Sequence, residues 1–461
     1  MLRRFWIGRD VWNRFRRRNL AGGDVLGAFI RAFRTPDLRN KLLFTLFILT
    51  VFRLGAVIPA PGINSAAIRE QLEAVQAQDS TGVFTLLNLF SGGALFQLAV
   101  FALGIMPYIT ASIIINLLTV VVPRLEALKK EGQSGQGKIT QYTRYLTLLL
   151  AVLQSSSIVA MARTGQLFQG QIPVSTYMPN QDPLTLVTIV ITMSAGTALI
   201  MWFGELITER GVGNGMSLLI FTTVVAGFPS AMTTMFQEQE AWVFGIICVA
   251  GLFLIAGVVF IEQAQRRIPV QYAKRMVGRR MYGGSSTYIP LKVNQAGIIP
   301  VIFASSLLYL PQLAIGLMGQ DADNPVANFI NSYFISGTHP IYMATFFFLI
   351  IGFAFFYVAI TFNPAEVADN MKKYGGFIPG IRPGRPTAEY LDYVLTRLTT
   401  PGSLYLGLIA LLPMVALGAS GATQNFPFGG TSILIMVGVG LDTVKQIESH
   451  LQQRNYEGFL R

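Results

Sequence analysis

Ten long apolar segments constrain this chain of 461 residues more than any other feature. A stretch of ~20 apolar residues is long enough to cross a bilayer as a helix. Because lipid offers no partner to backbone amides, such segments fold as helices. With 52% hydrophobic and only 13% charged residues, the chain is predicted to be an all-α polytopic membrane protein of ten transmembrane helices. The segments lie near residues 42–59, 98–122, 142–161, 184–207, 215–234, 242–261, 295–317, 341–362, 393–417 and 429–447.

The distribution of basic residues orients these helices. Most of the 35 Lys and Arg residues lie in four segments: the N-terminal stretch through Lys41 and the loops 123–141, 263–294 and 363–390. The opposite loops hold only Arg69 and Arg163. Because basic loops remain in the cytoplasm, both termini are predicted to be cytoplasmic, as an even number of spans requires. The Arg-rich residues 1–34 are either a basic topology anchor or an interfacial helix that lies on anionic lipid.

One short motif occurs in both halves of the chain. The sequence Gly-Ile-Met-Pro-Tyr-Ile at Gly104–Ile109 is echoed by Gly-Ile-Ile-Pro-Val-Ile at Gly297–Ile302. Each copy lies early in an apolar segment, where we expect its proline to interrupt the helical hydrogen bonding. Two matched, interrupted helices predict an internal repeat packed around a central pathway. We therefore divide the chain into a basic tail (1–40), a first five-helix half (41–235), a second five-helix half (236–447) and a C-terminal tail (448–461).

The segment that precedes the second span is apolar but too short to cross a membrane. Residues 81–97 are interrupted by Asn88 and contain Gly92 and Gly93, which can serve as a hinge into the following helix. We interpret this segment as a re-entrant half-helix in a water-lined vestibule, because lipid would leave its broken backbone unpaired. A surface helix in the external loop is the alternative.

Few residues of this chain could support catalysis or bind a metal. Its one cysteine, Cys248, and its two histidines, His339 and His450, are far apart in sequence, so we expect no disulfide and no metal site. Residues 132–138 approximate a phosphate-binding loop, but Ile139 stands where Ser or Thr should bind magnesium and no strand precedes it. We expect no cofactor and no enzymatic activity.

Several of these segments together resemble the SecY family, the channel subunits of the bacterial Sec protein translocase. The longest match is residues 90–115, which include Phe-Ser-Gly-Gly-Ala-Leu and the first copy of the echo. The order and spacing are similar to the family from about Pro36 to Gln446, whereas residues 1–34 are a longer basic extension than the family usually shows. Further matches are Lys-Lys-Glu-Gly at 129–132, Gln-Tyr-Thr-Arg at 141–144, Ile-Thr-Glu-Arg-Gly-Val-Gly-Asn-Gly at 207–215 and Pro-Gly-Ile-Arg-Pro-Gly at 379–384.

The resemblance implies a protein-conducting channel of two inverted halves. Such a channel passes unfolded polypeptides across the membrane and releases apolar segments sideways into lipid. An aliphatic collar can seal it, because an empty collar excludes water. The implied pore ring is Ile105, Ile109, Ile220, Ile302 and Ile435. The implied plug is residues 81–95, with Thr81, Phe84, Leu87, Asn88, Phe90, Gly92 and Gly93. The implied lateral gate lies between the second and seventh spans, with Thr110, Ser112, Gln154 and Asn294.

The basic cytoplasmic loops are candidate docking surfaces. A basic loop with aromatic residues suits ribosomal RNA phosphate or an acidic motor surface, and the second loop resembles the family segment required by the SecA motor ATPase. The resemblance further implies SecE-like and SecG-like small membrane subunits, signal peptides and nascent chains as partners. It places the protein in the bacterial plasma membrane, with the thylakoid membrane as the alternative. The candidate docking residues are Arg266, Arg267, Lys274, Arg275, Arg279 and Arg280 in the first loop and Lys372, Lys373, Arg382 and Arg385 in the second.

Two other functions are compatible with parts of this pattern. A secondary transporter would also show inverted repeats and broken helices, but coupled transport usually needs ionisable groups within the spans. Here Glu205, Glu262 and Asp442 lie at predicted cytoplasmic ends, and Arg53 lies deeper, where we expect it to be paired or to reach outward. A passive scaffold or insertase without a pore would need neither the short segment before the second span nor the paired interrupted helices.

Overall fold

The computed structural model describes residues 33, 35–65, 67–68, 92–95, 97–165, 167, 172–238, 241–272, 275–277, 280–282, 286–318, 333, 339–420 and 430–457. Each of the ten apolar segments overlaps one long helix in these ranges. The long helices are α3 (Pro36–Val57), α6 (Met106–Val121), α8 (Gln133–Arg163), α10 (Pro183–Arg210), α11 (Gly215–Glu238), α12 (Ala241–Gln263), α13 (Ile299–Met318), α15 (Pro340–Thr361), α17 (Arg385–Ser420) and α18 (Gly430–Glu457).

The apolar character of these helices makes the chain a multi-pass membrane protein. Seven described helices are long and apolar enough to cross a bilayer, and an eighth span is formed if α6 is joined to α7 (Pro123–Lys130), which is bent from it by 99°. The apolar part of α13 is shorter, Ile299–Leu308. Helix α18 carries Asp442, Lys445 and Glu448 from its middle onward, so hydropathy alone does not identify it as a span.

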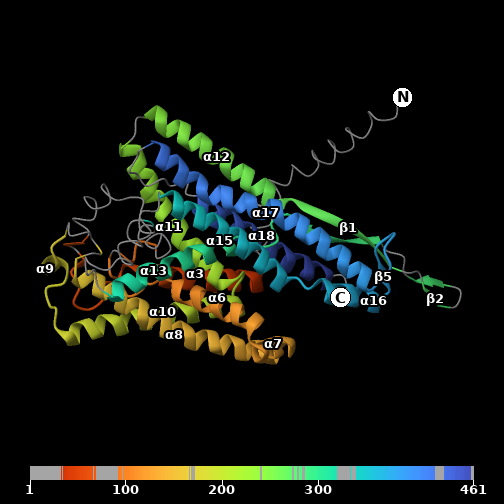
Figure 1. Ribbon diagram of the computed structural model, residues 1–461, viewed down its shortest axis with the longest axis horizontal. Coiled ribbons are helices and arrows are strands. Elements are labelled where there is room, and N and C mark those ends of the chain that lie inside the picture. The colour runs from red at the N-terminus through yellow and green to blue at the C-terminus, as the bar shows by residue number, and fades with distance from the viewer. Residues whose placement is uncertain are drawn as a thin grey trace.

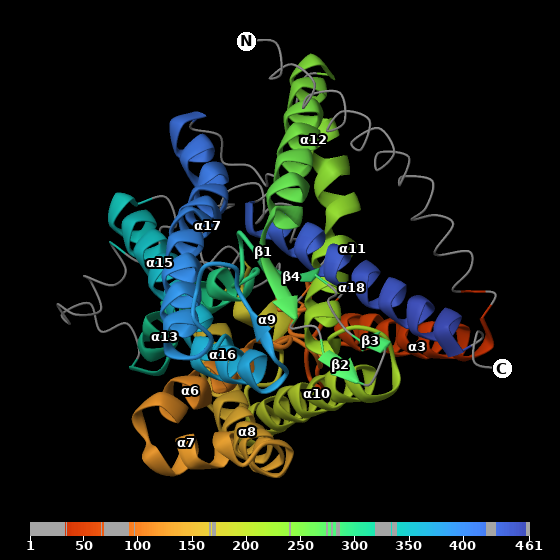
Figure 2. The ribbon, with the colours of Figure 1, turned by 90° about the vertical axis from the view of Figure 1, so that its right-hand side faces the viewer.

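The long helices run along the long axis of the molecule (Figure 1). The short helix α9 (Val174–Tyr177) lies at one end, and α7 and α16 (Pro364–Lys373) lie at the other. In the view along the bundle, α13 lies between α15 and α6 (Figure 2), and it packs against α6, α8 and α15. One continuous hydrophobic cluster joins residues of both halves, from Ile48 in α3 to Val439 in α18.

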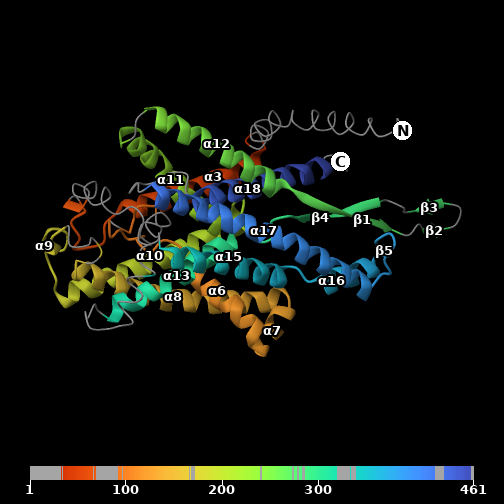
Figure 3. The same cartoon turned by 45° about the horizontal axis from the view of Figure 1, so that its top comes forward.

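The two basic loops contain strands that the all-α prediction did not include. Strand β1 (Gln265–Tyr272) pairs antiparallel with β4 (Ser286–Lys292) and with β5 (Gly376–Phe377), which belongs to the second loop. Strands β2 (Arg275–Val277) and β3 (Arg280–Tyr282) form a second hairpin beyond them (Figure 3). In β1, Ile268 and Val270 are buried whereas Arg267 and Pro269 are exposed, the period-two pattern of a strand with one covered face. The β1–β5 pairing makes the two loops one platform.

Both ends of the described chain meet at the same end of the bundle. Leu38 at the start of α3 is buried with Val212, which follows α10, and with Ile447 of α18. Leu42 and Leu451 pack against this cluster. The first residues of α3 and the last described residues of α18 therefore lie at the same end of the bundle.

At the opposite end of the bundle, the buried residue Tyr177 links two segments of the chain. The Tyr177 hydroxyl donates a hydrogen bond to the carbonyl of Ala162 at the end of α8, and the backbone N–H of Asn64 donates to the Tyr177 carbonyl over 3.0 Å. Burial raises the pKa of Tyr177 to about 12, so its hydroxyl is even farther from ionisation at physiological pH than that of an exposed tyrosine. This residue joins the loop after α3 to the end of α8.

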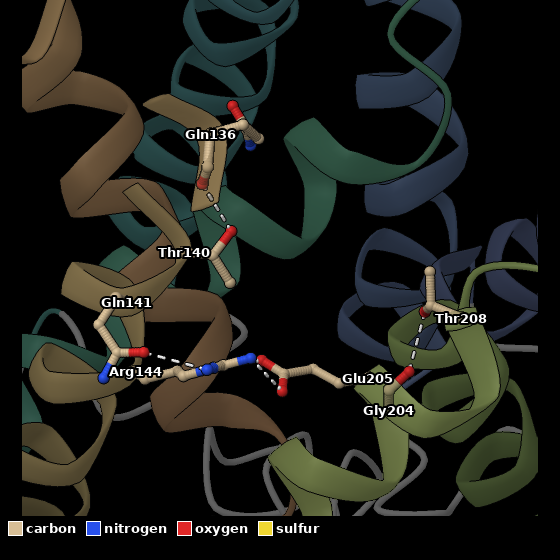
Figure 4. A network of polar contacts seen from close by, with 7 residues as sticks. All are labelled: Gln136, Thr140, Gln141, Arg144, Gly204, Glu205 and Thr208. Carbon is tan, nitrogen blue, oxygen red and sulfur yellow. Dashed lines mark hydrogen bonds and ion pairs between the residues drawn. The ribbon is translucent and has the colours of Figure 1, made fainter. Parts of the chain in front are cut away.

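A polar network ties α8 to α10 and to the turn that follows it (Figure 4). The Arg144 guanidinium makes two hydrogen bonds of 2.8 Å to the Glu205 carboxylate, and Gln141 accepts a third from Arg144. The Thr208 hydroxyl donates to the Gly204 carbonyl and accepts from the Gly215 N–H. The motif at 141–144 therefore binds Glu205, just before the motif at 207–215, a pairing that sequence spacing could not reveal.

We expect Arg144→Met to lower the thermal stability of the detergent-solubilised protein. The substitution leaves the Glu205 carboxylate, whose side chain is only 19% exposed, without its bidentate partner, at a cost of about 1 to 3 kcal/mol. The matched control is Lys130→Met, which breaks an ion pair between side chains that are 75% and 50% exposed and should cost at most about 0.5 kcal/mol. Equal melting temperatures for the two variants would contradict the account of this network.

Candidate functional site

The two copies of the echo have the same local structure. Gly104 and Gly297 both adopt a left-handed backbone, with φ of 55° and 61°, and in each copy the helix begins two residues later, at Met106 and at Ile299. The expectation that the prolines interrupt these helices is wrong. Each proline occupies the first turn, where no backbone N–H is needed and its fixed φ favours the start of a helix. The shared geometry supports an internal repeat.

The second apolar segment is not helical over its first residues. The segment was predicted to span from residue 98, yet α6 begins at Met106 and residues 100–105 form turns. The N–H of Ala60 donates to the Leu98 carbonyl over 3.0 Å, and the N–H of Val100 donates to the Ile58 carbonyl over 2.9 Å. The chain that leaves α3 thus supplies the hydrogen bonds that a helix would otherwise have supplied.

The five candidate ring residues are all buried and lie in one hydrophobic cluster. Ile105 precedes α6 and Ile109 lies in its first turn, while Ile220, Ile302 and Ile435 come from α11, α13 and α18. Each is at most 7% exposed. These side chains therefore line no open path in this structure, and they can exclude water because they offer it no hydrogen-bond partner.

The candidate gate residues have different partners. The Thr110 hydroxyl donates to the Met106 carbonyl of its own helix, and Ser112 is half-buried. Asn294 donates through its amide nitrogen to the Glu262 carboxylate over 2.6 Å and to the Gly297 carbonyl over 3.1 Å. Within the described residues, Gln154 has neither its amide nitrogen nor its amide oxygen paired, although it is 1% exposed.

The Asn294–Glu262 bond was not foreseen from the sequence. The available signal was the position of Glu262, an acidic residue in the last turn of the very apolar helix α12. Lys292 lies next to this pair and makes an ion pair of 3.2 Å with Asp442 of α18. The residues just before α13 are therefore bound through polar side chains to α12 and α18, which both belong to the second half. Neither of these bonds involves α6 or α8.

Most of the candidate plug lies outside the described residues. These plug residues are Thr81, Phe84, Leu87, Asn88 and Phe90. Gly92 and Gly93 are described, with φ of 66° and 87°. Only glycine adopts such angles at little cost, which agrees with their interpretation as a hinge. The Arg53 guanidinium of α3 donates to the Gly92 carbonyl over 3.1 Å, so the one deeply placed arginine of the first span is paired.

The described docking residues are exposed on the platform. Arg266 and Arg267 lie on β1, and the Arg267 guanidinium lies 4.7 Å from the centre of the Tyr288 ring, a cation–π distance. Lys372 and Lys373 end α16, and Arg382 and Arg385 lie in or just after the Pro-Gly-Ile-Arg-Pro-Gly motif. Lys274 and Arg279 lie outside the described residues, whereas Arg275 and Arg280 are described only as backbone of β2 and β3.

The loop that presents Arg382 is held by hydrogen bonds. The hydroxyl of Thr387, which is 1% exposed, donates to the Arg382 carbonyl over 2.8 Å. The N–H of Thr387 donates to the Gly384 carbonyl, and that of Ile381 to the Ile378 carbonyl. The Arg382 side chain therefore projects from a fixed backbone.

The structure offers no metal-binding cluster among the residues it describes, where no three His, Cys, Asp or Glu side chains could hold an ion together. The sequence that approximates a phosphate-binding loop forms the start of α8, from Gln133 onward, and no strand precedes it. A helix after a helix lacks the strand-to-helix loop that cradles phosphate.

Comparison with known proteins identifies the family. The SecY family model matches residues 99–444, which is more than half of the chain. The chain belongs to the SecY family. It is 64% identical over 441 residues to the protein translocase subunit SecY of Streptomyces scabiei, covering 95% of this chain and all of that protein. It is 58% identical over 444 residues to the protein of the same name from Mycobacterium tuberculosis, with 95% and 100% coverage.

Solved structures share the fold of this SecY-family chain. A protein-conducting channel matches with a TM-score of 0.57 at 18% identity, covering 89% of this chain and 91% of that one. A SecY structure whose plug domain is described as stabilising the closed channel and maintaining a membrane seal matches at 0.58, 20% identity and the same coverage. Canine Sec61 from a ribosome-channel complex matches at 0.56 and 18% identity, again with 89% and 91% coverage.

Proposed function

We propose that this SecY-family chain forms a channel that conducts unfolded polypeptides across the membrane and releases transmembrane segments sideways into lipid. The observation that carries the proposal is that five isoleucines, at the start of the two echo helices and on α11 and α18, are buried in one hydrophobic cluster. A passenger of any sequence must pass such a site without binding tightly, and ions must not leak. An aliphatic constriction meets both requirements, because it offers no specific polar contact and dewets when empty.

The fold supports the arrangement of this channel as ten spans in two inverted halves. The halves are α3 to α11 and α12 to α18, and the matched starts of α6 and α13 relate them. Both ends of the described chain pack in one cluster, which an even number of spans requires. With the basic platform at the same end of the bundle as α7 and α16 (Figure 3), both termini are cytoplasmic. The bacterial relatives favour the plasma membrane over the thylakoid.

The lateral gate is the seam where α13 packs against α6 and α8. Separation of this seam would open the collar to lipid and pass an apolar segment out of the pathway. The unpaired Gln154 amide supports a seam that opens, because a buried amide without partners destabilises the closed packing. In the resting state, residues 81–95 act as the plug, and Gly92 and Gly93 provide its hinge. Signal peptides and nascent chains are the ligands that separate the seam and displace the plug.

The cytoplasmic platform is the docking surface for the partners that drive export. Ribosomal RNA is attracted by the exposed arginines of β1 through release of counterions from phosphate. The motor ATPase SecA contacts the fixed loop around Arg382. Small SecE-like and SecG-like subunits and anionic lipid complete the assembly. The chain itself is a channel subunit and not an enzyme.

A secondary transporter is the alternative function, and the ionisable groups argue against it. Arg53 is bound by a backbone carbonyl, and Arg144 of α8 is bound by Glu205 of α10. Glu262 lies in the last turn of α12. These contacts tie helices together and form no ion-binding cluster within the described spans, which coupled transport would require.

Replacing two ring residues tests the channel directly. We expect Ile109→Gly together with Ile302→Gly to raise the resting ion conductance of reconstituted protein in planar bilayers and to relax the signal-peptide requirement for export. The physical reason is that the widened collar no longer dewets. The matched control replaces Ile191 and Ile246, which are 62% and 60% exposed on the outer surface, by glycine, so that the intrinsic cost to the helices is the same. Wild-type conductance in the ring variant would refute the collar.

Charge reversals separate the two docking functions. We expect Arg382→Glu to abolish motor-driven export while ribosome binding is retained, because one fixed contact to the motor is lost. Arg266→Glu with Arg267→Glu should instead weaken ribosome binding and flatten its salt dependence by about two charges. Arg163→Glu is the control for a single charge reversal. Arg163 is exposed and is the last residue of α8. If both platform variants show the same defect in export and ribosome-binding assays, the proposed division is wrong.

A further inference from the structure

We propose that Arg53 is a positioning residue that fixes the Gly92 hinge against α11 beside the pore ring and so holds the channel in its resting state. The inference rests on the proposed plug, which continues from this hinge. Its first basis is the hydrogen bond of 3.1 Å from the Arg53 guanidinium to the Gly92 carbonyl. An arginine within a span is costly in lipid unless it is bound, so this bond stabilises the residue and the hinge together.

The hinge is also crowded from the other side. A β-carbon added at Gly92 would lie 2.7 Å from the Arg53 guanidinium and 3.3 Å from Cβ of Thr223, whereas one added at Gly93 would meet nothing within 4 Å. Thr223 is buried in α11 and donates to the carbonyl of Ile220, a ring residue. Gly92 is therefore held between α3 and the turn of α11 that carries the proposed ring residue Ile220.

The chain after the hinge is immobilised independently. Ala94, Ala99 and Ala56 of α3 form a buried cluster, and the backbone of residues 98–100 pairs with that of 58–60. Because these contacts fix the chain from Ala94 onward, the proposed hinge lies at Gly92 and Gly93 rather than farther along the chain. The Arg53 guanidinium therefore contacts the hinge itself, at Gly92. Loss of this one hydrogen bond can release Gly92 from its position against α11.

The test measures resting conductance and export of a passenger with a defective signal peptide. We expect Arg53→Met to increase both, with conductance rising about tenfold, the change that follows loss of one charge-assisted hydrogen bond. Arg53→Lys keeps one charged donor and should recover much of the seal, which a purely structural role for side-chain bulk would not produce. Arg163→Met removes an exposed arginine at the end of α8 and should change neither readout. Deletion of residues 81–90 serves as the positive control for the plug.

A second pair of variants keeps the test decisive if Arg53→Met does not fold. Gly92→Ala and Gly93→Ala share the same backbone strain, because both glycines have positive φ, but only the first pushes against Arg53. Gly92→Ala should leak more than Gly93→Ala, and adding Arg53→Met to Gly92→Ala should increase the leak little further, since both act on one contact.

The outcomes separate this inference from the proposed function. If the deletion leaks but Arg53→Met seals like the wild type, or if the two alanine variants leak equally, the Arg53 inference is wrong and the plug stands. If the deletion does not leak, the plug assignment itself fails and the inference fails with it. Leak in Arg53→Met with recovery in Arg53→Lys supports the inference.

Discussion

The structure depends on how the backbone is hydrogen-bonded where the second span departs from a helix. Lipid cannot pair the amides of residues 92–105, so this stretch has to be enclosed by protein. The chain after α3 pairs with residues 98–100, Arg53 binds the Gly92 carbonyl, and α6 begins only at Met106. Because irregular backbone at membrane depth is tolerated only inside protein or along a cavity, the break marks the interior of the bundle. Ile105 is the last residue of this stretch, and Ile109 lies in the first turn of α6.

The second half has the same left-handed glycine two residues before α13 as the first half has before α6. The two helix starts bring aliphatic residues to one buried cluster. The seal that we propose uses shape and water exclusion, whereas polar contacts hold the elements around it. Asn294 is bound to Glu262, and Lys292 to Asp442, so the start of α13 is tied to its own half. Its seam with α6 and α8 is therefore free to separate without breaking these bonds. Arg144 and Glu205 likewise tie α8 to α10 within the first half.

Much of this could be predicted from the sequence, because hydropathy reports burial in lipid directly. Each apolar segment overlapped a long helix, and the resemblance to the SecY family is confirmed by the family match. The features that were predicted wrongly or not at all have local causes. Pro107 was expected to break a helix that it starts, since a proline alone does not show whether its missing N–H was needed. The strands were missed although Ile268 and Val270 alternate with the exposed residues Arg267 and Pro269. The Asn294–Glu262 and Arg144–Glu205 pairs could be found only from tertiary distances.

The most direct measurement of the central claim is export through a channel whose seam is covalently closed. Cysteines at Ile113 of α6 and Ser306 of α13, both buried, are introduced after Cys248→Ser. A disulfide requires α-carbons within about 7 Å, so rapid oxidation itself reports that the two helices face each other. The account predicts that the closed disulfide stops export of a signal-bearing passenger and that a long flexible linker on the same pair restores it. Full export through a verified disulfide would show that polypeptides do not need this seam to open.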